Sequence, residues 1–209
     1  MTETSLDFDP SRLAAVLYRP GDDVDTLLAE FAMDLLENGE RVGGVVQRNQ
    51  KDPHGKLATM RVIDLLTGRD IGISQALGAG SHACKLDAAG LAEASQAVTN
   101  AIAGAVNLVI VNKFSQQEAS GGGLRNELGN AILAGLPVLT AVSEKCIGAW
   151  KEFTGDRGTT LLCARHVVDS WWNEVSYRDA IVRGVPPSAR RASTLISSFS
   201  PAPRDAFGI

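Results

Sequence analysis

The segment from Tyr18 to Asp25 combines a tight turn with three carboxylates. It reads Tyr-Arg-Pro-Gly-Asp-Asp-Val-Asp and lies between an apolar run and a stretch with helical periodicity. A strand, a turn and a helix in this order bind phosphate when the turn has the spacing G-x-x-x-x-G-K-[S/T]. Backbone N–H groups and the lysine then hold the phosphates, and the hydroxyl holds magnesium. The first question is therefore whether this turn binds phosphate.

The charged groups of this turn have the wrong sign for a triphosphate. With Pro20-Gly21 in the turn, Asp23 stands at the second glycine, Val24 at the lysine and Asp25 at the hydroxyl. Carboxylates at the start of a helix satisfy the helix dipole and repel an anion. Two like charges about 4 Å apart cost about 4 kcal/mol at an effective dielectric constant of about 20. Acidic capping of a helix is the simplest interpretation, and a loop that binds a nucleotide in another way is the alternative.

A second candidate position lies at the end of the apolar run 106–114. In enzymes that hydrolyse nucleoside triphosphates, the corresponding strand ends in an aspartate for magnesium, and a residue that orients water completes the site. Here the two positions that follow the apolar residues are Asn112 and Lys113. An amide and an ammonium group can do neither task, so the sequence argues against hydrolysis.

Lys113 has two alternative roles, because the start of the helix and the end of the strand should meet at the carboxyl edge of a sheet. In the first, Lys113 forms an ion pair with Asp23 or Asp25 where magnesium phosphate would otherwise lie. In the second, Lys113 faces a crevice and binds a small anion such as a phosphate or another oxyanion. The side chains expected beside it in that case are Gln47, Arg48 and Arg125.

A glycine-rich loop follows Lys113. Glu118 lies five residues further along, and Gly121-Gly122-Gly123 precede the next helical segment. Three glycines permit positive φ angles or a close approach of the backbone to a ligand at the start of that helix. Exposed N–H groups there are a second candidate anion site, and a flexible connector is the alternative. A residual hydrolytic activity would depend on Glu118.

The cysteines and histidines do not suggest a metal site. The chain has three of each, and no four of them have zinc-like spacing. An odd number of cysteines favours free thiols in a reducing compartment. Cys84 precedes a helical segment whose N-terminus could lower the pKa of its thiol, and a buried apolar role is the alternative.

Alternating strand and helix patterns position these residues. The expected strands cover residues 12–18, 41–49, 106–114 and 136–143, with one or two more within 56–77 that are joined at Thr67-Gly68. The expected helices cover residues 23–39, 87–105 and 124–135. This alternation predicts an α/β fold with a mostly parallel sheet, helices on both faces and a β-hairpin insertion.

Composition limits the number of domains and the kinds of partner. With 209 residues and 44% apolar side chains, the chain can bury one full core. We expect a domain over residues 1–170 and a C-terminal extension over 171–209, in which Trp171 and Trp172 serve packing rather than base stacking. A net charge of −4 argues against nucleic-acid binding. The polar start and the lack of a long apolar run predict a cytoplasmic protein that does not enter a membrane.

Several segments together resemble an uncharacterised bacterial family, the domain of unknown function 2478. They are residues 13–28, 42–49, 60–74, 84–87 and 111–142, and the resemblance extends over about Leu13 to Phe153. That family is similar to small P-loop nucleoside-triphosphatases, in which a Gly-Lys-Thr loop, a hairpin and an Asp-Glu strand end recur in this order. The resemblance implies a P-loop fold with degenerate nucleotide motifs.

The function implied is a non-hydrolysing regulatory protein that binds a small anion or a nucleotide, and a repurposed nucleotide-hydrolysing or phosphoryl-transfer enzyme is the alternative. Related sequences are associated with molybdenum metabolism, which makes molybdate a candidate ligand. We also expect a homo-oligomer; the sequence identifies no cofactor, and no catalytic or metal-binding residue is assigned. The candidate ligand-binding residues are Arg19, Gly21, Asp23, Asp25, Gln47, Arg48, Cys84, Asn112, Lys113, Glu118 and Arg125.

Overall fold

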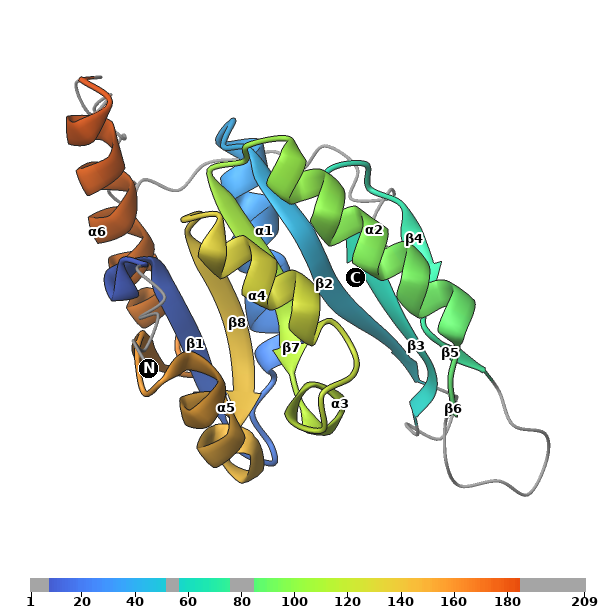
Figure 1. The fold of residues 1–209 in the computed structure, drawn as a ribbon. Coiled ribbons are helices and arrows are strands. Elements are labelled where there is room, and N and C mark those ends of the chain that lie inside the picture. Colours follow the sequence, from blue (N-terminus) through green and yellow to red (C-terminus); the bar gives the residue numbers. More distant parts are fainter. Residues whose placement is uncertain (1–7, 52–56, 76–84, 185–209) are drawn as a thin grey trace, which may run out of the picture. The chain divides into compact units, whose positions relative to one another are not determined.

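Seven strands form one sheet in the order β4-β3-β2-β7-β8-β1-β9 (Figure 1). The computed structural model describes residues 8–51, 57–75 and 85–184. The strands of this sheet are β1 (Leu13–Tyr18), β2 (Val42–Lys51), β3 (Leu57–Asp64), β4 (Asp70–Gly72), β7 (Leu108–Phe114), β8 (Val138–Ser143) and β9 (Thr159–Leu162). β5 (Ser74–Gln75) and β6 (Lys85–Leu86) form a separate small sheet. β2, β7, β8, β1 and β9 are parallel, whereas β3 and β4 are antiparallel. The predicted mostly parallel sheet with a hairpin insertion is therefore confirmed.

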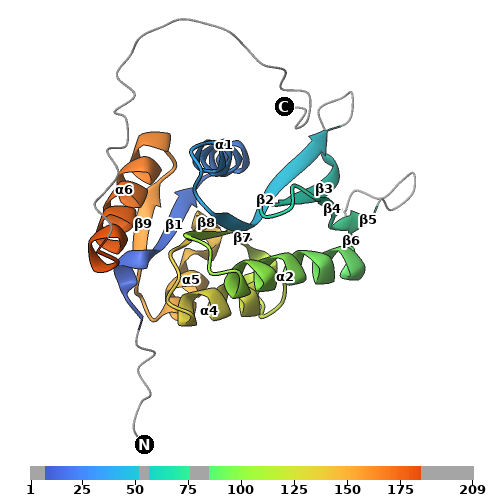
Figure 2. The same cartoon turned by 90° about the horizontal axis from the view of Figure 1, so that it is seen from above.

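Helices cover both faces of the sheet, as the sequence predicted (Figure 2). α1 and the part of α6 up to Ser176 lie on one face, and α2, α4 and α5 lie on the other. The helices are α1 (Val24–Glu37), α2 (Ala88–Ala103), α3 (Gln116–Ala119), α4 (Arg125–Leu133), α5 (Ile147–Thr154) and α6 (Arg165–Val182), with 3-10 turns η1 (Pro10–Arg12) and η2 (Glu144–Cys146). Within residues 8–51, 57–75 and 85–184, none of these helices has the length and apolar character to cross a membrane.

Each face of the sheet carries its own apolar core. Val16, Leu28 and Phe31 are fully buried on the α1 face, and Trp171 and Trp172 are 6% and 3% exposed against the same cluster. The packing role predicted for the tryptophans is thus confirmed. The boundary expected between residues 170 and 171 falls inside α6, and the compact unit that contains the sheet ends at Ser176. Residues 185–209 of the predicted extension lie outside the described part of the chain.

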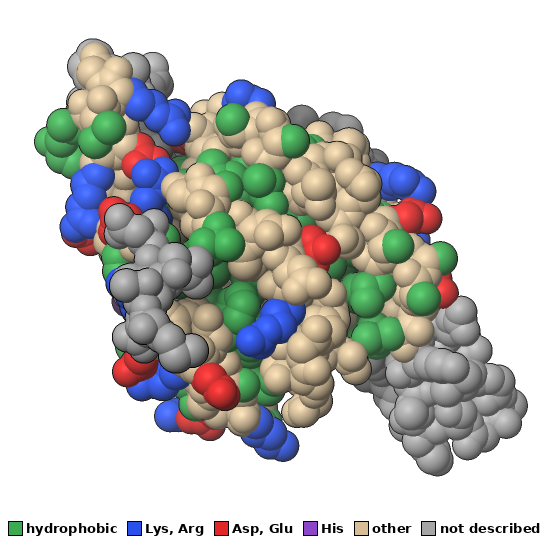
Figure 3. All heavy atoms as spheres, in the orientation of Figure 1, with side chains coloured by type: hydrophobic (Ala, Val, Ile, Leu, Met, Phe, Trp, Pro, Cys, Tyr) green, Lys and Arg blue, Asp and Glu red, His purple; other side chains and the backbone are tan. Residues whose placement is uncertain are grey.

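Charged side chains are dispersed over the face that carries α2, α4 and α5 (Figure 3). Among the described residues on this view, basic and acidic groups alternate, and the basic ones do not form a continuous surface. Affinity for a nucleic-acid backbone comes from clustered Lys and Arg side chains. This face does not present such a cluster.

The carboxyl edge of the sheet is where the connecting segments separate. The chain leaves β1 for α1 on one face, and it leaves β7 and β8 for α3, α4 and α5, of which α4 and α5 lie on the other face. In open α/β sheets, ligands bind where neighbouring strands diverge in this way. β2 pairs with β7 over Val42–Val45 only, and its remainder extends beyond this edge paired with β3. The long hairpin therefore adds side chains from β2 to the edge.

Gly44 permits the close contact between β2 and β7, and it provides a test of this arrangement. Its φ angle is +97°, and a Cβ atom at this position would lie 2.1 Å from the carbonyl oxygen of Ile110. We expect Gly44→Ala to lower the free energy of unfolding by about 3 kcal/mol or more, measured by urea denaturation. The control is Gly148→Ala in α5, where a Cβ atom would meet nothing within 4 Å. It should be neutral or stabilising by up to about 1 kcal/mol. Equal effects of the two substitutions would contradict the close contact.

Candidate functional site

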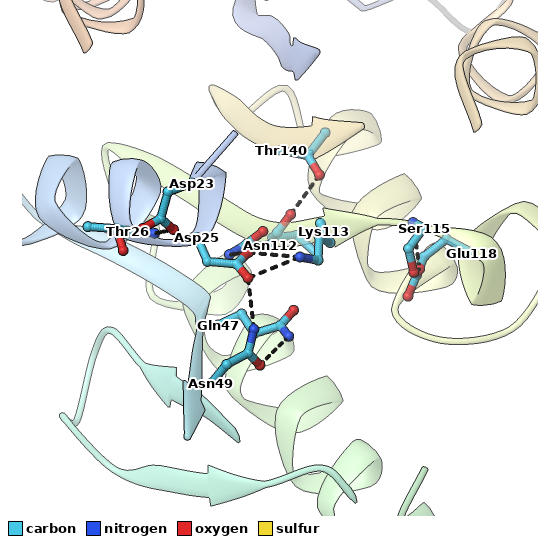
Figure 4. Close-up of polar contacts among 11 residues, drawn as sticks. Asp23, Asp25, Thr26, Gln47, Asn49, Asn112, Lys113, Ser115, Glu118 and Thr140 are labelled. Atoms are coloured by element: carbon cyan, nitrogen blue, oxygen red, sulfur yellow. Dashed lines mark hydrogen bonds and ion pairs between the residues drawn. The ribbon is translucent and has the colours of Figure 1, made fainter. Parts of the chain in front are cut away.

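Three side chains from two strands converge on the carboxylate of Asp25 at the carboxyl edge (Figure 4). The ammonium nitrogen of Lys113 lies 2.9 Å from Oδ1 and 3.1 Å from Oδ2 of Asp25. The side-chain amide of Asn112 donates to Oδ1 at 3.1 Å, and that of Asn49 donates to Oδ2 at 3.0 Å. Of the two roles considered for Lys113, the structure therefore contains the ion pair with Asp25.

Local structure explains how these residues meet. Asp25 lies in the first turn of α1, two residues after the N-cap Asp23, whereas Asn112 and Lys113 lie near the end of β7. Asn49 lies on the part of β2 that extends beyond the sheet edge. Gln47, two residues earlier on the same strand, donates its amide to Oδ1 of Asn49 at 2.6 Å. This bond turns the N–H groups of Asn49 toward Asp25.

The acidic turn before α1 satisfies its own backbone. The Asp23 side chain accepts a hydrogen bond from the Thr26 N–H at 3.2 Å, which makes it the N-cap of α1. The Asp22 side chain accepts from the Arg19 N–H at 2.8 Å. Gly21 has a φ angle of +102°, which a glycine adopts without strain. Acidic capping of the helix, the simplest interpretation of this turn, is confirmed.

The ion pair is largely shielded from water but remains reachable. The side chains of Lys113 and Asp25 are 19% and 18% exposed, and Asn112 is 3% exposed. Within the described residues, Oδ1 of Asn112 is a buried acceptor without a hydrogen-bond partner. Electrostatic attraction increases as water is excluded, so removing one partner of this pair should cost more than breaking an exposed pair.

The Tyr18 ring forms one wall of the site. The Lys113 ammonium lies 5.3 Å from the ring centroid, within cation–π distance. Burial, and then the charge of Asp25, raises the pKa of the Tyr18 phenol above its usual value. The phenol therefore stays neutral at physiological pH, and the ring offers Lys113 a contact that does not depend on a carboxylate.

Glu118 holds the glycine-rich loop together. Its buried carboxylate accepts hydrogen bonds from the N–H and hydroxyl of Ser115, both at 2.9 Å, and from the Leu124 N–H at 3.1 Å. The N–H groups of Gly121 and Gly122 donate to carbonyl groups of the preceding residues Glu118 and Gln117. These bonds occupy the carboxylate that a residual hydrolytic activity would need, and two of the three glycine N–H groups that an anion would need.

The remaining candidate residues lie in other contacts. The Arg125 guanidinium stacks 4.3 Å from the centroid of the Phe153 ring and donates to the Glu118 carbonyl. Arg48 pairs with Asp70 at 3.3 Å, and Arg19 pairs with Glu144 in an exposed position. Cys84 lies outside the described residues.

Of the candidates, the structure brings together Asp25, Gln47, Asn112 and Lys113. Asn49 was missed, although alternation along a strand places it on the same side as Gln47. That spacing is the signal that could have found it.

Metal-binding and thiol chemistry find little support in the described part of the chain. No group of three or more His, Cys, Asp or Glu side chains there is placed to hold a metal ion. Burial, followed by the charges of Asp22 and Asp23, raises the pKa of the Cys163 thiol. Cys163 is therefore protonated at neutral pH and is a poor nucleophile.

Replacing Lys113 tests the contribution of the ion pair. Lys113→Met leaves the partly buried Asp25 carboxylate with amide donors only, and we expect the free energy of unfolding to fall by about 2 to 3 kcal/mol. The matched control is Lys151→Met, because Lys151 pairs with Asp156 at 3.0 Å with both side chains more than half exposed. It should cost about 0.5 kcal/mol or less. Equal losses in urea denaturation would show that the Lys113 pair contributes no more than a surface pair.

Replacing Glu118 tests its role in the loop. Glu118→Gln places an N–H2 group against a backbone N–H, so one buried donor loses its partner at a cost of about 2 kcal/mol. Amide hydrogen exchange should become faster at Ser115 or at Leu124, depending on which of them the glutamine nitrogen faces. Glu127→Gln is the control, because Glu127 accepts one hydrogen bond from the Ser95 hydroxyl, which a glutamine oxygen can also accept. Unchanged protection of both amides in Glu118→Gln would rule out this role.

Comparison with known proteins places the chain in a family. It is 61% identical over 180 residues to the Molybdenum import ATP-binding protein ModC 2 of Bradyrhizobium diazoefficiens, and the match covers 85% of this chain and 20% of that protein. The chain thus spans about a fifth of the length of this relative. The solution structure of a human cancer-related nucleoside triphosphatase matches 82% of this chain and 98% of its own, with 14% identity and a TM-score of 0.47. A family model matches residues 13–171, and the chain belongs to that family, which is described as "Protein of unknown function (DUF2478)".

Proposed function

We propose that this chain is a non-hydrolysing regulatory module that binds a small oxyanion on a degenerate P-loop scaffold and serves molybdenum import. The observation that carries the proposal is the convergence of Lys113, Asn112 and Asn49 on one carboxylate. An ammonium group and two amides form a donor set suited to an oxyanion, since each of them donates hydrogen bonds toward the same point.

The side chains at the strand end argue against hydrolysis. Magnesium is bound by oxygen ligands such as carboxylates, hydroxyl groups and phosphates. In this site, the Lys113 ammonium lies against Asp25, at the strand end where hydrolysis would need a bound magnesium ion. Glu118, the alternative group for activating water, has a carboxylate that already accepts three hydrogen bonds. The arrangement supports binding without turnover.

The charges favour a small oxyanion over a nucleoside triphosphate. The Lys113 ammonium supplies the positive charge of the donor set, and Asp22 and Asp23 lie on the adjoining turn. Each of these carboxylates repels a chain of phosphates, and the repulsion grows with the number of charges that the ligand carries. A compact anion that contacts only the three donor groups is repelled less by these carboxylates.

The relative supplies the biological context. Its name refers to molybdenum import and ATP binding, and a stretch of it is 61% identical to this chain. A module that occurs within such a protein supports a role beside the import machinery. Molybdate is therefore the first oxyanion to test.

Two measurements test the proposal. We expect the purified chain to release no phosphate from ATP or GTP with Mg²⁺, and its Tm to rise with molybdate, tungstate, sulfate or phosphate. At a ligand concentration of about 100 Kd the stabilisation is about 2.7 kcal/mol, or several degrees in Tm. Lys113→Met, compared with its own ligand-free Tm, should lose the shift. Turnover at an ordinary enzymatic rate, or a shift with ATP alone, would overturn the proposal, as would the absence of any shift with the oxyanions.

A further inference from the structure

We infer that the Asp25 carboxylate is an internal competitor that occupies the position of the ligand and controls access of an anion to Lys113, Asn112 and Asn49. This inference rests on the proposed function and adds the regulation of the same site. Its starting observation is that every contact expected of a bound oxyanion is already made by one side chain of the protein (Figure 4).

The contacts match the shape of the group that the carboxylate would mimic. Lys113 and Asn112 donate to Oδ1, and Lys113 and Asn49 donate to Oδ2. A carboxylate presents two oxygens on one central atom, as does each edge of a tetrahedral oxyanion. Both accept hydrogen bonds and donate none when fully ionised. The ligand class is therefore a small anion with two adjacent acceptor oxygens.

The Asp25 side chain can move away from these donors without becoming a buried charge that lacks a partner. Asp25 lies in the first turn of α1, where the helix dipole favours a carboxylate. Its side chain is already 18% exposed, so a rotation can bring it to water. The cost of release is then the loss of the ion pair and of the two amide bonds, and a bound anion restores both.

Lys113 can also change partner while remaining in place. Its ammonium lies 5.3 Å from the centroid of the Tyr18 ring, a contact that does not require the Asp25 carboxylate. The donors from β7 and β2 are held by their strands, and Gln47 fixes the amide of Asn49. The donor set is preorganised, so the Asp25 side chain is the part that has to move.

Competition of this kind lowers the apparent affinity by the fraction of molecules in which the donors are open. Removing the charge of Asp25 should therefore strengthen anion binding. This result distinguishes the inference from a purely structural role, because a variant that merely loosens the site would bind more weakly.

The test compares two neutralised carboxylates at the same helix end. Asp25→Asn should bind molybdate, sulfate or phosphate at least about tenfold more tightly than the native chain in isothermal titration. The matched control is Asp23→Asn, which removes the same charge from the N-cap, where asparagine serves as well as aspartate. It should change the affinity by less than about threefold, because it affects only the surrounding potential.

A second measurement does not depend on any variant. In ¹⁵N-labelled native chain, titration with molybdate should shift the side-chain amide signals of Asn49 and Asn112. The amide of Gln96, which bonds to Asn100 on the exposed face of α2, is the reference and should stay unchanged.

The outcomes separate the inference from the proposed function. If neither the native chain nor Asp25→Asn binds any of the three anions, the proposed function fails and the inference fails with it. If the native chain binds and a folded Asp25→Asn binds equally or more weakly, the inference alone is overturned. If only Asp25→Asn binds, Asp25 excludes the anion as inferred, but the native chain does not bind it and the proposed function fails.

Discussion

The ion pair between Asp25 and Lys113 joins the start of α1 to the end of β7 across 88 residues of sequence. Removing either partner leaves the other charge partly buried, which costs more than breaking an exposed pair. The carboxylate at the helix start and the ammonium at the strand end are therefore one feature of the structure. Together with the amides of Asn49 and Asn112, they form a polar cluster at the carboxyl edge of the sheet.

The fold could be predicted from the sequence where the chain repeats a strand, a turn and a helix with periodic apolar residues. β1, α1, β7 and β8 came out within a few residues of their observed bounds, because strands buried on both faces appear as continuous apolar runs. β9 was not predicted, since three of its four residues are exposed. α6 was not predicted either, although Val168, Trp171, Trp172 and Val175 are buried at helical spacing.

The site could be predicted from the sequence only in part. Asp25 and Lys113 were found because the order of turn and strand end along the chain fixes which edge they share. The position of the Arg125 side chain was not predicted, because its guanidinium packs on the Phe153 ring. This contact depends on where α5 lies. Glu118 likewise has a purely local reason for its position, the capping of α3, which no distant motif reveals.

The hydrogen bond between Trp171 and the carbonyl of Ser11 spans 160 residues, so the last helix of the core is tied to the 3-10 turn that precedes β1. A ribosome releases β1 and α1 long before α6 exists. Until Trp171 and Trp172 emerge, the apolar side chains of Val16 and Phe31 on the α1 face lack part of their cover. We expect the nascent chain to need protection on that face until α6 has emerged and covered it.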